Sequence, residues 1–115
     1  MYFKTNKLTS TNYEYKFILT IPENYIGNVS VVVNETGNEI TYYEWDLTEK
    51  KLKDSLFTLK IMSKNSAEDI LDDTEEPYKK ISEKNDLVYT ILIHENDSIY
   101  KIDFDFIKEN FLLFD

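Results

Sequence analysis

The chain has 115 residues, of which 42 % are hydrophobic and 15 % aromatic, with one histidine and no cysteine. This length fits a single domain over residues 1–115, and the apolar fraction is sufficient for a packed core. The lack of cysteine excludes disulfides and thiolate chemistry. No segment is apolar for long enough to cross a bilayer, and the N-terminus has no apolar signal region. We therefore expect a cytoplasmic protein without membrane contact.

The net charge of −9 comes entirely from the C-terminal part of the chain. Residues 1–64 hold eight acids and eight Lys, whereas residues 65–115 hold fourteen acids and five Lys. All basic residues are Lys, which lacks the planar fork with which Arg reads guanine and grips phosphate. We therefore do not expect direct binding of nucleic acid.

The first part of the chain predicts four strands, because apolar and polar residues alternate in it with a period of two. A hairpin loop around Gly37, which can adopt a positive φ, joins the second strand to the third. The four strands are expected at residues 13–21, 28–33, 39–47 and 55–62. In the first, the residues expected on one face of the strand are Tyr13, Tyr15, Phe17, Leu19 and Ile21.

The third predicted strand carries aromatic residues on both faces. Tyr43 and Trp45 alternate with Tyr42, so they point to the opposite side. Tyr and Trp are common anchors of binding sites, and they are equally good core residues in strands. Both interpretations stay open for Tyr43 and Trp45.

Residues 66–84 predict a broken helical segment. Ser66 can cap the first helix, and Pro77 can sit in the first turn of a second helix with Tyr78 and Ile81 as its apolar anchors. Six of the eleven residues from 66 to 76 are acidic. A helix start explains Glu68 and Asp69. It does not explain the closely spaced later acids, which are Asp72, Asp73, Glu75 and Glu76.

Residues 87–94 are the most apolar segment and predict a central strand that is buried on both faces. Residues 99–106 predict a further strand, with Asp103 and Asp105 on its solvent side. The tail, residues 107–115, is expected to end as a short helix or a strand. The predicted class is α+β, a curved antiparallel sheet of about six strands with the helical segment of residues 66–84 packed on one face.

Catalytic signals are weak. With two glycines, the chain has no phosphate-binding glycine loop. One hypothesis is a small enzyme or a ligand- or metal-binding domain that uses His94 with Glu95, Asp103 or Asp105. His94 is the only histidine, and a residue at the edge of a turn is the simpler interpretation. We expect no cofactor and no metal.

The leading hypothesis is a non-enzymatic inhibitor that binds a basic partner. Nucleic-acid-processing enzymes have phosphate-binding clefts lined with Lys and Arg, which an acidic protein can occupy as a nucleic-acid mimic. An immunity protein against a nuclease toxin and a phage-encoded inhibitor of a nuclease defence such as CRISPR both fit. The expected contact residues are Asp72, Asp73, Glu75, Glu76, Asp103, Asp105, Tyr43 and Trp45. A third hypothesis is a subunit of a larger assembly, and the sequence leaves a homo-oligomer open.

Overall fold

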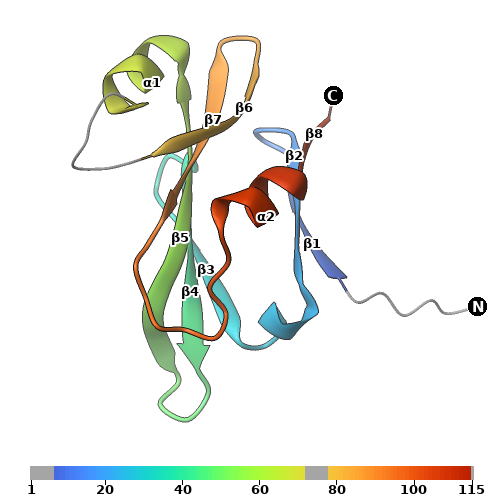
Figure 1. Ribbon diagram of the computed structural model, residues 1–115, viewed down its shortest axis with the longest axis vertical. Coiled ribbons are helices and arrows are strands. Elements are labelled where there is room, and N and C mark those ends of the chain that lie inside the picture. The colour runs from blue at the N-terminus through green and yellow to red at the C-terminus, as the bar shows by residue number, and fades with distance from the viewer. Residues whose placement is uncertain (1–6, 72–77, 115) are drawn as a thin grey trace, which may run out of the picture.

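The computed structural model describes residues 7–71 and 78–114. Within these ranges the chain forms eight strands in two antiparallel sheets, together with two short α-helices (Figure 1). The smaller sheet has the strand order β1-β2-β8, and the larger has the order β3-β4-β5-β7-β6. The mostly antiparallel architecture is in line with an α+β class. It differs from the predicted single sheet of about six strands with one helical segment.

The smaller sheet consists of β1 (Lys7–Asn12), β2 (Phe17–Pro22) and β8 (Phe111–Leu113). A tight turn separates β1 from β2, because the Asn12 side chain accepts a hydrogen bond from Tyr15 N at 2.8 Å and Lys16 adopts a φ of +56°. The strand predicted at residues 13–21 therefore starts only at Phe17. Tyr13 lies in this turn and is 80 % exposed, so it does not share a strand face with Phe17, Leu19 and Ile21.

The larger sheet follows the sequence-based expectation more closely. Gly37 has a φ of +79° in the turn between β3 and β4, as predicted. Strand β7 lies between β5 and β6, and its middle residues 88–91 are buried, which confirms the central strand. The strands of this sheet are β3 (Val29–Val33), β4 (Glu39–Asp46), β5 (Lys51–Ser63), β6 (Lys79–Lys84) and β7 (Leu87–Ile93).

The helical segment predicted at residues 66–84 is only partly helical. Helix α1 (Lys64–Leu71) starts before Ser66, and the Ser63 hydroxyl accepts a hydrogen bond from Ser66 N at 3.3 Å. Pro77 lies outside the described residues. The predicted second helix is wrong, because the residues that follow Tyr78 form β6 and pair with β7. Pairing with an apolar central strand outweighs the helix-like spacing of Tyr78 and Ile81.

The strand predicted at residues 99–106 is also wrong. Helix α2 (Phe104–Glu109) begins here, because the Asp103 carboxylate accepts a hydrogen bond from Phe106 N at 2.9 Å and thereby caps the helix. The predicted alternation of burial nevertheless holds. Four partly buried residues of this segment pack against the core, namely Tyr100, Ile102, Phe104 and Phe106.

One hydrophobic core lies between the two sheets. The Tyr42 ring stacks on Phe57 with 4.4 Å between the ring centroids, and its hydroxyl donates to Ser10 Oγ on β1 at 3.0 Å. A short 3-10 turn, Glu23–Tyr25, and helix α2 supply Tyr25 and Ile107 to the same core. Within the described ranges, no helix has the length and apolarity needed to cross a lipid bilayer.

Replacement of Ile107 by Ala tests the docking of α2 on this core. The Ile107 side chain is 0 % exposed, so its truncation should lower the free energy of unfolding by about 2–5 kcal/mol in urea denaturation. The exposed neighbour Glu109 provides the control, because Glu109→Ala should change this free energy by less than about 0.5 kcal/mol. Equal effects of the two variants would contradict the docked helix.

Candidate functional site

An open pocket of about 750 Å³ lies between the end of β7 and the start of α2. The chain leaves β7, runs along the lower part of β5 and turns back toward α2 (Figure 1). The outgoing and the returning halves of this connection form the walls of the pocket. Its lining residues are Ile93, His94, Glu95, Asn96, Asp97, Lys101, Ile102 and Asp103.

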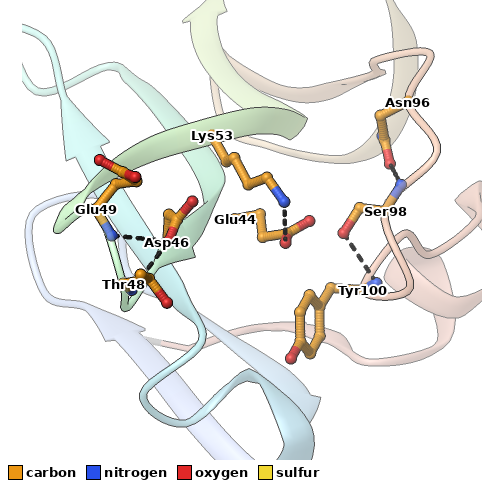
Figure 2. A network of polar contacts seen from close by, with 8 residues as sticks. All are labelled: Glu44, Asp46, Thr48, Glu49, Lys53, Asn96, Ser98 and Tyr100. Carbon is orange, nitrogen blue, oxygen red and sulfur yellow. Dashed lines mark hydrogen bonds and ion pairs between the residues drawn. The ribbon is translucent and has the colours of Figure 1, made fainter.

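Side-chain hydrogen bonds hold this connection in place (Figure 2). Asn96 Oδ1 accepts from Ser98 N at 2.9 Å, and Ser98 Oγ accepts from Tyr100 N at 3.1 Å. The Asn96 amide also donates to the Ser55 carbonyl of β5 at 3.3 Å. Tyr25 donates its hydroxyl proton to the Tyr100 carbonyl at 2.6 Å. The pocket wall is therefore tied to both the sheet and the core.

The charge of the pocket lining is predominantly negative. Glu95, Asp97 and Asp103 contribute three carboxylates against the single ammonium group of Lys101, and all four residues are exposed. The Asp103 carboxylate is oriented by its hydrogen bond to the start of α2. An open acidic pocket of this kind is suited to a cationic group such as a Lys or Arg side chain.

His94 is part of a hydrogen-bonded chain of side chains on the sheet. Its Nε2 lies 2.8 Å from the Thr58 hydroxyl, which in turn lies 2.9 Å from the Thr41 hydroxyl. Thr58 is buried. Partial burial lowers the pKa of His94 below its ordinary value, because removal from water disfavours the charged ring.

A second polar group in Figure 2 orders the β4–β5 hairpin. The Asp46 carboxylate accepts hydrogen bonds from Glu49 N at 3.0 Å and Thr48 N at 2.9 Å. The bond from Glu49 is the largest cause that lowers the pKa of Asp46. Lys53 Nζ lies 3.6 Å from a Glu44 carboxylate oxygen. These contacts are local and fix the turn.

The structure brings together some of the residues that the sequence singled out. His94, Glu95 and Asp103 line the same pocket, whereas Asp105 lies in the first turn of α2 and is absent from the lining. Asp103 and Asp105 flank a helix start and do not share the face of a strand. Asp97 is missing from the sequence-based set. The sequence feature that could have identified Asp97 is its position two residues after Glu95, directly after a strand predicted to be buried.

The predicted aromatic contacts lie elsewhere. Tyr43 and Trp45 are half-buried and alternate on β4 with Tyr42, which is in the core. They therefore point away from the core, while Asp103 and Asp105 belong to the layer on the core side. The remaining predicted contacts, Asp72, Asp73, Glu75 and Glu76, lie outside the described residues.

The two helices lie on different sides of the larger sheet. Ala67 of α1 packs with Met62 and Val88, which alternate with the core residues Ile61 and Tyr89 on their strands. Helix α2 lies on the core side. Helix α1 contains the first two acids of the acidic stretch 66–76. The larger sheet therefore lies between this helix and the two residues Asp103 and Asp105.

Within the described ranges, no three His, Asp or Glu side chains are grouped so that they could hold a metal ion. Comparisons with protein-family models, with curated proteins and with solved structures find no match to this chain. The assignment of the pocket as the candidate site therefore rests on the structure of this chain alone.

The lowered pKa of His94 predicts a pH-dependent stability. An unfolded His titrates near 6.5, and the folded state binds this proton less tightly. Acidification below about 6.5 therefore favours the unfolded chain. Urea denaturation at decreasing pH should show a larger loss of stability for the wild type than for His94→Gln, which removes the titrating group. The same loss in both proteins would contradict the assigned shift.

Proposed function

We propose that the chain is a small acidic binding protein of the cytoplasm, without catalytic activity of its own, that inhibits a basic nucleic-acid-processing enzyme. The observation that carries this proposal is the open pocket whose lining holds Glu95, Asp97 and Asp103 against a single Lys. Enzymes that act on nucleic acids present Lys and Arg in their phosphate-binding clefts. Such a side chain is of the right charge to enter the pocket.

The exposure of the carboxylates indicates how they would act. Exposed ion pairs contribute at most about 1 kcal/mol each to affinity. Their main effect is to steer a partner of opposite charge, which raises the association rate. The net charge of −9 acts in the same direction. Binding should therefore weaken with rising salt concentration, mainly through slower association.

The arrangement around His94 gives one of its two ring nitrogens a partner on the sheet. Its Nε2 is engaged by the Thr58 hydroxyl, and that hydroxyl also pairs with the hydroxyl of the partly buried Thr41. A general base needs a free ring nitrogen within reach of a substrate proton. The bond to Thr58 favours a structural role for this nitrogen.

Not every residue in the sequence-based set lines the pocket. Tyr43 and Trp45 are absent from its lining. We propose Glu95, Asp97 and Asp103 as the primary contacts. An immunity protein and a phage-encoded inhibitor share this chemistry, so the identity of the captured enzyme would distinguish them.

Charge reversal in the pocket tests the proposal. The chain should capture a basic nuclease or related enzyme from a lysate of its source organism at low salt, and should inhibit it. The double variant Glu95→Lys, Asp97→Lys should slow association with that enzyme by about 10-fold or more, measured by surface plasmon resonance at low and high salt. Asp103 stays unchanged in this variant because it caps α2.

The control is the double variant Glu23→Lys, Glu35→Lys. It makes the same change in net charge at two exposed positions of the N-terminal half, and it should slow association much less. Equal slowing by the two double variants would assign the effect to net charge and remove the pocket from the proposal. Undiminished association in both would contradict the electrostatic mechanism as well.

A further inference from the structure

Among the described residues, strand β3 is an edge of the larger sheet and pairs with β4 on one side only. Asn34 N donates to the Glu39 carbonyl, and Trp45 N donates to the Asn28 carbonyl. Hydrogen-bonded residues alternate along an antiparallel pair, so Ser30 and Val32 also direct their backbone groups to β4. Val29, Val31 and Val33 therefore point theirs outward, where the described strands offer no neighbour to β3 other than β4.

The side chains of β3 are unusual for an exposed edge. The strand reads VSVVV, without charge, proline or bulge. Val31, Val32 and Val33 are 44 %, 43 % and 53 % exposed. The opposite edge, β6, carries several charged side chains and a break in register near Ile81. Charges and bulges on edges are the usual protection against strand addition. Strand β6 has this protection and β3 lacks it.

An apolar hollow of about 260 Å³ adjoins β3 on its core side. Its lining includes Tyr25, Ile26, Val29, Val31 and Tyr42. Val29, Val31 and Val33 share this face of β3, because they alternate with Ser30 and Val32. A strand added beside β3 would place the side chains of its own alternate residues over the hollow.

We propose that this edge pairs with β3 of a second copy of the chain, antiparallel and centred on Val31, so that the two larger sheets become one. In this register Val31 faces Val31 of the second copy, and Val29 faces Val33. The outward N–H and C=O groups of all three valines are then used, which gives about six hydrogen bonds.

The distribution of charge favours a second copy at this position. Two molecules of net charge −9 repel each other, but all the excess charge lies downstream of Lys64, and β3 belongs to the balanced part. Across the two-fold axis the facing pairs are Val–Val and Ser30–Val32, and Asn28 faces Asn34. No like charges meet. A self-complementary strand of this kind is what a two-fold dimer requires.

The dimer should be weak and concentration-dependent, because one pair of five-residue strands is smaller than a standard interface of about 800 Å² per partner. Sedimentation equilibrium from micromolar to millimolar concentration should show a monomer–dimer equilibrium. High salt should increase the dimer fraction by screening the repulsion between copies. This is opposite to the salt dependence expected for a basic partner, so the two proposals fail independently.

Single cysteines test the register directly, since the chain has none of its own. In the Val31→Cys variant the two facing Cα atoms lie about 5.5 Å apart, within the disulfide range of about 4.4–6.8 Å. Oxidised glutathione should therefore give a covalent dimer. In the Val33→Cys control the two cysteines are more than about 13 Å apart. It should stay monomeric alone and cross-link only when mixed with Val29→Cys.

Hydrogen exchange provides a readout without substitution. The amides of Val29, Val31 and Val33 should exchange fast in dilute solution and slowly at high concentration, whereas those of Ser30 and Val32 should be protected in both. A protein that stays monomeric at millimolar concentration, with equal cross-linking of the Val31 and Val33 variants, would overturn the proposal. Protection of the three valine amides only on addition of another protein would assign the edge to a foreign strand and would equally overturn it.

Discussion

The contact between Tyr42 and its neighbours in both sheets is the interaction on which the architecture depends. The ring stacks on Phe57 within the larger sheet, and the hydroxyl reaches Ser10 of the smaller one. The side chain is almost fully buried, so its polar end must have a partner. Burial is also the largest cause that raises the pKa of this hydroxyl, which keeps it a neutral donor. One residue thus supplies apolar area to the core and fixes the spacing between the sheets.

The sequence predicted the larger sheet better than the rest, for a physical reason. Strands β4, β5 and β7 have their own apolar pattern, and Gly37 marks a turn that requires a positive φ. Strand β6 has only Ile81 as a buried residue and takes its structure from pairing with β7. The segment from Tyr100 to Phe106 shows the converse. Its burial alternates as predicted, but the Asp103 cap turns the backbone into a helix. Periodicity reports which side chains are buried, and backbone conformation also depends on capping and pairing.

The candidate site shows the same division between local and non-local information. The excess of acids after Lys64 is plain from composition. The pocket cannot be inferred from composition. It forms because the connection after β7 returns toward α2 and brings Asp103 to the same pocket as Glu95 and Asp97. Hydrogen bonds that the Asn96 and Ser98 side chains make with backbone groups hold that return in place. The predicted strand placed Asp103 and Asp105 on the same face. In the structure Asp103 lines the pocket and Asp105 does not.

The pairing of β8 with β2 has a consequence for how the molecule is made. Phe17 faces Leu113 and Leu19 faces Phe111 in this pair, so the smaller sheet joins residues from the two ends of the chain. Contacts between such distant residues form late, because the intervening chain must first be ordered. During synthesis the β1–β2 hairpin emerges before β8, so Phe17 and Leu19 are at first without their β8 neighbours. Phe17 and Leu19 therefore reach their native environment only once β8 has been synthesised.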